Sequence, residues 1–232
     1  MNHFINLLLT KGFVRTNEPL ESTLVVHAVA GAGKSTLIRQ FLSEHPKARA
    51  YTHGIPDPPN LTGRCIQPFK TPSTEHFNIL DEYCAEPITA TWDVLIADPL
   101  QHKNLPRRPH YIKATSHRLG PDTCALLREV GIEVTPRESA DKVVSSGIFE
   151  KPLYGEIISL DRPTLDLLRA HNLNPKCPQE VLGQEFPVVT VVSSIPLSQV
   201  RLKYQVYIAL TRHLEELHVR APANPHPASR PQ

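Results

Sequence analysis

A glycine-rich segment near the amino terminus has the residue types and spacing of a phosphate-binding loop. The run from Ala28 to Ser35 matches the pattern G-x-x-x-x-G-K-[ST] at every fixed position except the first, where alanine replaces glycine. Gly31 and Gly33 allow backbone amides to turn toward phosphate oxygens, and the next helix points its positive end at the same place. Lys34 would reach the β and γ phosphates. The predicted nucleotide-binding residues are Ala28, Val29, Ala30, Gly31, Ala32, Gly33, Lys34, Ser35, Thr36 and Asp81.

Two adjacent carboxylates, Asp81 and Glu82, end a second apolar run. In P-loop hydrolases the second half of the site needs one acid for the Mg²⁺ shell and one group that orients or deprotonates the attacking water. We therefore expect Ser35 and Asp81 to bind the metal and Glu82 to act on water. An acidic turn after a strand is common in other proteins, so this interpretation depends on the P-loop.

Short apolar runs alternate with helical patterns, and these elements must position the loop and the acids. Residues 24–29 form a β-branched run, and residues 36–42 place their apolar side chains on one helical face. Further predicted strands span 77–80, 94–97, 156–160 and 188–192, and further predicted helices span 4–9, 121–130, 164–170 and 198–214. Strands that alternate with helices predict an α/β fold with parallel sheets.

Length and composition agree with a globular protein. The 232 residues permit one large domain or two smaller lobes, and hydrophobic residues make up 40% of them. The net charge of +2 is too small to indicate nucleic acid binding by itself. The four cysteines form no CxxC pair, which argues against a zinc site and fits a reducing, intracellular setting. The apolar run 4–9 is too short for a secretion signal or a membrane span.

Any RNA site must therefore be local, and the stretch 102–118 is the best candidate. It carries Lys103, Arg107, Arg108 and Lys113 with histidines between them. A solvated basic loop would have the same composition, so both interpretations stay open for this stretch.

Three later segments, taken in order, resemble the motifs of superfamily 1 helicases. Gln101 ends a segment that resembles the third motif, Arg118 ends one that resembles the fourth, and Arg212 ends one that resembles the sixth. The resemblance implies that Gln101 contacts the γ phosphate. It also implies that the two arginines stabilise charge on the transferred phosphoryl group from a second lobe. The catalytic residues implied are Lys34, Glu82, Gln101, Arg118 and Arg212.

The RNA-contacting residues are assigned from weaker signals. Residues 181–186 resemble the fifth helicase motif, although Leu182 stands where the family usually has threonine. A segment just after the P-loop helix resembles another helicase motif, and aromatic or imidazole rings there could stack on bases. The expected RNA-contacting residues are Tyr51, His53, Arg107, Arg108, Gly183 and Glu185.

Almost the whole sequence resembles the triple gene block movement and silencing-suppressor family of potexvirus-like plant RNA viruses. The runs 25–36 and 54–57 are typical of that family, as is the shortness of the chain. The resemblance implies two small RecA-like lobes with parallel sheets, the core of a superfamily 1 helicase. We expect lobe 1, with the P-loop, at 1–113, and lobe 2, with the two arginines, at 114–221. A disordered proline-rich tail is expected at 222–232.

The resemblance also implies a function, with ATP and Mg²⁺ as cofactors. Family members are expected to be RNA-binding ATPases that move viral RNA from cell to cell through plasmodesmata and suppress host RNA silencing, in the host cytoplasm. The implied partners are single-stranded viral RNA, further copies of the chain in a homodimer or oligomer, viral coat protein, the other triple gene block movement proteins and host silencing factors. Two alternatives stay open. One is a non-enzymatic RNA-binding scaffold with a vestigial NTPase, and the other is a P-loop kinase for a small metabolite.

Overall fold

The computed structural model describes residues 1–223 and shows two compact units, residues 1–118 and a second unit from Leu119 onward. The boundary follows residue 118, whereas the sequence predicted it after residue 113. Arg118 therefore belongs to the first unit. The predicted disordered tail lies outside the described residues except for 222 and 223. Within the described part, no helix combines the length and apolar character needed to cross a membrane.

The first unit is built on a seven-stranded sheet in the order β1-β7-β2-β6-β5-β3-β4. Neighbouring strands are parallel except β1 and β7, which are antiparallel. Along the chain its elements are α1 (Asn2–Thr10), β1 (Val14–Arg15), β2 (Leu24–Ala28), α2 (Lys34–Glu44), β3 (Ala48–Thr52), β4 (Ile66–Pro68), β5 (Phe77–Asp81), β6 (Val94–Ala97), the 3₁₀ helix η1 (Pro99–Gln101) and β7 (Tyr111–Lys113).

The parallel arrangement brings the carboxyl ends of β2, β3, β5, β6 and β7 to one edge of this sheet. Ligands of open α/β sheets bind at that edge. All residues of β2 and β6 are buried, as expected for central strands covered on both faces. Strand β6 lies between β2 and β5, so the P-loop and the acidic pair follow strands that are two positions apart.

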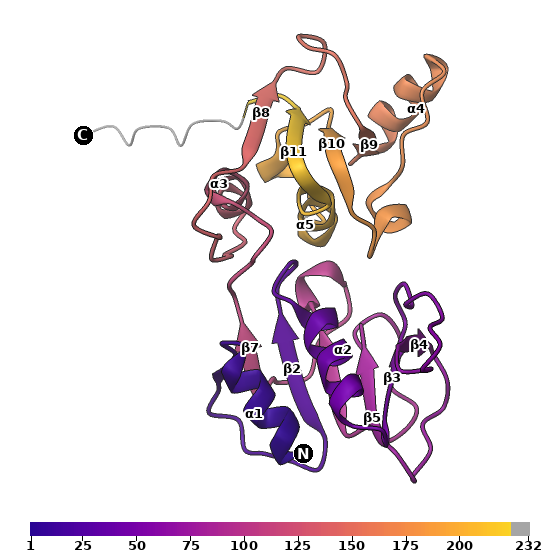
Figure 1. Ribbon diagram of the computed structural model, residues 1–232. Coiled ribbons are helices and arrows are strands. Elements are labelled where there is room, and N and C mark those ends of the chain that lie inside the picture. The colour runs from indigo at the N-terminus through magenta and orange to yellow at the C-terminus, as the bar shows by residue number, and fades with distance from the viewer. Residues whose placement is uncertain (224–232) are drawn as a thin grey trace, which may run out of the picture. The chain divides into compact units, whose positions relative to one another are not determined.

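Helices α1 and α2 cover one face of the first sheet (Figure 1). The ring of Phe4 on α1 meets Phe41 on α2 edge-on, with centroids 5.0 Å apart, and both rings contact Phe77 of β5. Phe4 and Leu8 are fully buried one helical turn apart. This packing anchors the helix that begins at the P-loop.

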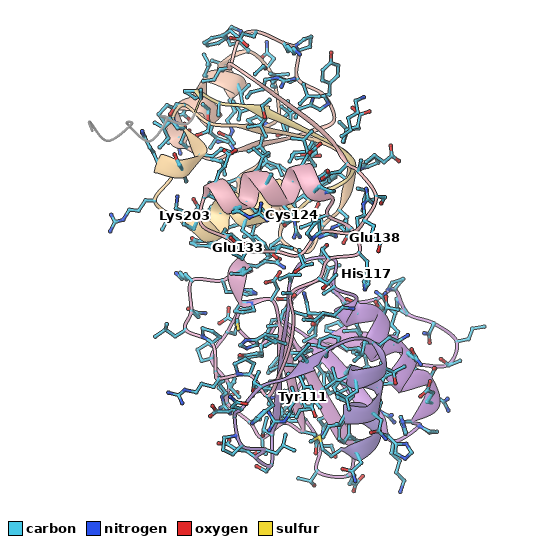
Figure 2. The ribbon with its side chains drawn as sticks, turned by 90° about the vertical axis from the view of Figure 1, so that its left-hand side faces the viewer. Tyr111, His117, Cys124, Glu133, Glu138 and Lys203 are labelled. Carbon is cyan, nitrogen blue, oxygen red and sulfur yellow. The ribbon has the colours of Figure 1, made fainter. Side chains whose placement is uncertain are left out.

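The second unit contains a four-stranded sheet, all parallel, in the order β8-β11-β10-β9. Helix α3 carries Cys124 and α5 begins at Lys203, both labelled in Figure 2. The elements are α3 (Pro121–Glu129), β8 (Lys142–Ser146), β9 (Glu156–Ser159), α4 (Arg162–Ala170), η2 (Pro178–Val181), β10 (Phe186–Val192), η3 (Leu197–Gln199), α5 (Lys203–Leu210) and β11 (His213–Arg220). The predicted α/β class with parallel sheets is confirmed.

One predicted helix is wrong in extent. The sequence predicted a helix over 198–214, but the structure has η3, the shorter α5 and then the strand β11. All five residues 206–210 are buried, so α5 lacks the polar face that would mark where it ends. The last part of β11 is buried as well, because this strand lies inside the sheet between β8 and β10.

Candidate nucleotide-binding site

The predicted P-loop connects β2 to α2. Gly31 and Gly33 have φ values of +74° and +91°, the left-handed region that glycine adopts at little cost. The Lys34 ammonium donates hydrogen bonds to the carbonyl oxygens of Ala28, at 3.1 Å, and Val29, at 3.4 Å. These contacts keep the lysine against the loop that it would serve. Of the other predicted loop residues, Ala30 and Ala32 are buried, Ser35 is half-buried and Thr36 is exposed.

A second segment, residues 116–118, holds the P-loop from beside it. The buried Ser116 hydroxyl donates to the carbonyl oxygen of Ala30 at 2.8 Å, and the His117 amide donates to that of Gly31 at 3.0 Å. A Cβ atom at Gly31 would lie 2.6 Å from Ser116 Oγ and 2.7 Å from Arg118 Cβ. Arg118 therefore starts beside the phosphate loop within the first unit, and the expectation that a second lobe supplies it is corrected.

Asp81 lies at the carboxyl end of β5 and is only 7% exposed. Thr52 donates to its Oδ2 at 3.2 Å, while Oδ1 is buried and has no hydrogen-bond partner within the described residues. Burial, and after it the charge of Glu82, raise the pKa of Asp81 to about 7, although the Lys34 ammonium opposes the shift. A buried carboxylate oxygen without a donor suits a hard cation such as Mg²⁺. The residues present thus fit the metal that the sequence predicted.

Glu82 and Gln101 are held by two neighbours, His102 and Asp98, that the sequence did not assign to the nucleotide site. Asp98 is fully buried; its Oδ1 accepts from the amide of Leu100, and its Oδ2 accepts from Gln101 Nε2 at 2.8 Å. The Oε2 atom of Glu82 lies 2.9 Å from His102 Nε2. Gln101 and Glu82 therefore both have fixed side-chain directions at the same edge of the sheet. In the sequence, the contact between His102 and Glu82 was indicated only by the position of His102 directly after Gln101.

Arg212 lies at the junction of α5 and β11 in the second unit, and it is only 3% exposed. Its guanidinium donates to the carbonyl oxygens of Ile208, at 3.1 Å, and Gln184, at 3.4 Å, and to the hydroxyl of Thr211, at 2.9 Å. These bonds hold the end of α5 against the turn that follows η2. Arg212 thus has a structural role in its own unit besides the catalytic role expected from the sequence.

The two ring-bearing RNA candidates have different surroundings. Tyr51 belongs to the core, where its ring meets the edge of the buried Trp92 with centroids 5.9 Å apart. The expectation that Tyr51 stacks on RNA bases is corrected, because β3 points this ring inward. His53 lies just beyond β3 and stacks on Phe69, which is 40% exposed, with centroids 4.3 Å and planes 20° apart.

The remaining RNA candidates are all at the surface. Arg107 and Arg108 are exposed on the loop between η1 and β7, and Arg108 approaches Glu18 at 3.8 Å. Gly183 and Glu185 are exposed before β10 in the second unit, where Gly183 has a φ of +77°. Exposure makes these four residues accessible to a ligand.

A family model, the viral superfamily 1 RNA helicase core domain, matches residues 24–221. The movement and silencing protein TGBp1 of Papaya mosaic potexvirus is 64% identical over 233 residues, which cover all of both chains. TGBp1 of Plantago asiatica mosaic potexvirus is 48% identical over 230 residues, 98% of this chain and 100% of that one. A solved arterivirus nonstructural protein 10 (helicase) with DNA has the same fold, with a TM-score of 0.63 and 16% identity. That match covers 86% of this chain and 60% of the arterivirus chain.

The fold and the site thus define a P-loop protein with a viral superfamily 1 helicase core. Within that class, the chain belongs to the movement and silencing protein family of potexviruses, the family of TGBp1. It spans the full length of these plant-virus relatives and about 60% of the arterivirus helicase.

Proposed function

We propose that this chain is an RNA-binding ATPase that helps to transport viral RNA from cell to cell through plasmodesmata and that suppresses host RNA silencing. The observation that carries the enzymatic part is the juxtaposition of Lys34 with the acidic pair Asp81 and Glu82 at one edge of a parallel sheet. Transport and suppression rest on the names of the relatives, which are movement and silencing proteins.

The side chains of the site divide the chemistry of ATP hydrolysis among them. The Lys34 ammonium and the loop amides would bind phosphate oxygens. Ser35 and Asp81 would hold Mg²⁺, which supplies positive charge to the phosphates when bound. Glu82 would accept the proton of the attacking water, and Gln101, fixed by Asp98, would contact the γ phosphate. Arg118, beside the loop, would stabilise the charge that develops on the transferred group.

The proposed RNA contacts are exposed groups of the first unit. Arg107 and Arg108 would contact phosphates, and the stacked pair His53 and Phe69 offers a ring face to a base. We also propose that the chain acts in the host cytoplasm and at plasmodesmata and that it self-associates. Viral coat protein, the other triple gene block proteins and host silencing factors complete the proposed set of partners.

The first experiment is steady-state ATP hydrolysis by the purified chain with and without single-stranded RNA, at equal protein concentration. Lys34→Ala should abolish turnover and leave the thermal midpoint nearly unchanged, because the lysine acts on phosphate charge and lies outside the core. Arg212→Ala should also lower turnover, but its melting curve must be recorded, since the guanidinium is part of the packing of the second unit. Unchanged turnover in Lys34→Ala would exclude the enzymatic proposal.

The burial of Arg212 favours a second candidate, a non-enzymatic RNA-binding scaffold with a vestigial NTPase. An arginine that is 3% exposed and bonded to carbonyl oxygens of its own unit must leave those partners before it can stabilise a phosphoryl group. A scaffold would move RNA and suppress silencing equally well as wild type and as Lys34→Ala. An ATPase whose turnover drives these functions would lose them in that variant.

A further inference from the structure

The carboxylate of Glu82 is held by an imidazole that follows the third helicase-like motif. Glu82 Oε2 and His102 Nε2 are 2.9 Å apart, and the two side chains are only 19% and 6% exposed. The backbone of Glu82 has a φ of +53°, a region that costs a residue with a side chain on the order of 1 kcal/mol or more. Such a backbone persists only where its surroundings hold it, and His102 also sets the direction of the carboxylate.

The loop that begins at His102 is tied to the next two residues after Glu82. The backbone amide of Arg107 donates to the Tyr83 hydroxyl at 3.1 Å, and the side-chain amide of Asn104 donates to the carbonyl oxygen of Cys84 at 2.8 Å. Three consecutive residues, from Glu82 to Cys84, therefore each contact the loop 102–109. A shift of this loop would move the segment that carries the acid.

The same loop presents cations and an apolar side chain to solvent. Lys103, Arg107 and Arg108 are exposed, and Leu105 is almost fully exposed at 97%. The loop 102–109 therefore contacts the segment that carries Glu82 and also exposes positive charge to solvent. A polyanion bound at the charges would act on the loop, and through the loop on the acid.

We propose that His102 is a positioning residue for Glu82, and that single-stranded RNA bound to the loop 102–109 changes the rate of ATP hydrolysis through the contact between these two side chains. This inference rests on the proposed ATPase function and adds to it a named route from the RNA to the acid. His102 acts on Glu82 alone and has no contact with ATP in this scheme.

The test compares His102→Ala with His102→Gln in the full-length chain. The glutamine Nε2 can donate to Glu82 much as the imidazole does, whereas alanine cannot. For each variant we would measure the thermal midpoint, the kcat and KM for ATP, the affinity for a fluorescent single-stranded RNA, and the ratio of kcat with RNA to kcat without it. The thermal midpoint shows whether a variant folds. If His102→Ala does not fold, the kinetics of His102→Gln test the proposal.

We expect His102→Ala to lower kcat about tenfold or more, a part of the contribution of a general base, while the KM for ATP changes by less than about twofold. The RNA stimulation ratio should fall to about one without loss of RNA affinity, and His102→Gln should recover most of kcat and of the stimulation.

Other results would overturn the inference. A wild-type or increased kcat in His102→Ala would show that the imidazole does not position the acid. A glutamine variant as slow as the alanine variant would show that the ring acts only through packing. RNA stimulation that persists in His102→Ala would break the proposed route. A wild-type chain that hydrolyses no ATP would instead overturn the proposed function, and this inference with it.

Discussion

The hydroxyl of Tyr83 lies 2.6 Å from Nε2 of His27, with the two rings stacked at a centroid distance of 5.9 Å. His27 belongs to β2, which leads into the P-loop, and Tyr83 directly follows the acidic pair. The contact spans β6, which separates β2 from β5 in the sheet. The Tyr83 hydroxyl also accepts a hydrogen bond from the backbone amide of Arg107. The pair of His27 and Tyr83 therefore links the phosphate loop, the acidic segment and the basic loop.

The burial of His27 makes the stability of the fold depend on pH. Burial lowers the pKa of His27 to about 4, from an unfolded value of about 6.5. A lowered pKa contributes stability that is present above about pH 6.5 and is lost as the pH falls toward 4, because only the unfolded chain then binds the proton. At about 1.4 kcal/mol per pKa unit, the loss approaches about 3 kcal/mol.

His27→Gln should flatten this dependence, since glutamine can still hydrogen-bond with Tyr83 but does not titrate. Urea unfolding at about pH 5 and about pH 7 would measure the free energy of unfolding of both proteins. His171→Gln, at an exposed histidine in the second unit, is the matched control and should follow the wild-type curve. If the free energy of unfolding of His27→Gln changed with pH as it does in the wild type, His27 would not be the source of the pH dependence.

Gly31 should tolerate a side chain much less well than Gly12, although both have φ values near +75°. An alanine at Gly12 meets no atom within 4 Å in the described part of the chain, so it should cost only about 1 to 2 kcal/mol of left-handed strain. An alanine at Gly31 would also collide with Ser116 and Arg118. Gly31→Ala should therefore be less stable than Gly12→Ala and should lose binding of a fluorescent ATP analogue, which Gly12→Ala keeps.

Tyr51 should behave as a core residue in an RNA-binding assay. Tyr51→Phe keeps the ring against Trp92 and should leave both stability and RNA affinity close to wild type. Tyr51→Ala should lower the free energy of unfolding by about 3 to 5 kcal/mol, the usual cost of removing a buried aromatic ring. Phe69→Ala, at an exposed ring, should cost less stability and weaken RNA binding. A Tyr51→Phe variant that is stable but binds RNA poorly would contradict this assignment and would show that the tyrosine hydroxyl contacts RNA.

The double variant Arg107→Ala/Arg108→Ala should bind single-stranded RNA more weakly, with a smaller dependence on salt. If each arginine neutralises one phosphate, the slope of log K against log salt should shrink by up to about 1.4, at about 0.7 per phosphate. Fluorescence anisotropy across a salt series measures both quantities. A double alanine variant at Arg128 and Arg162, two exposed arginines of the second unit, is the charge-matched control. Equal slopes in the two variants would remove the basic loop from the RNA site.

The sequence by itself determined the features that depend on neighbours along the chain. The P-loop, the acidic pair after β5 and most of the central strands are local patterns, because a turn or a strand end is specified by a few adjacent residues. The family could be recognised for the same reason, since its motifs are short segments in a constant order. The P-loop, the acidic pair and these strands were placed correctly, whereas the predicted helix 198–214 ends early and is followed by β11.

Only the tertiary structure decided which side chains meet. Thr52 contacts Asp81, His102 contacts Glu82 and residues 116–118 hold the P-loop, because parallel strands bring the ends of distant segments to one edge. Burial was decided in the same way: Tyr51 lies on the inward face of its strand, and Arg212 is covered by its own unit. Spacing along the chain records which residues follow one another, whereas these contacts depend on the order of strands in the sheet, which spacing does not specify.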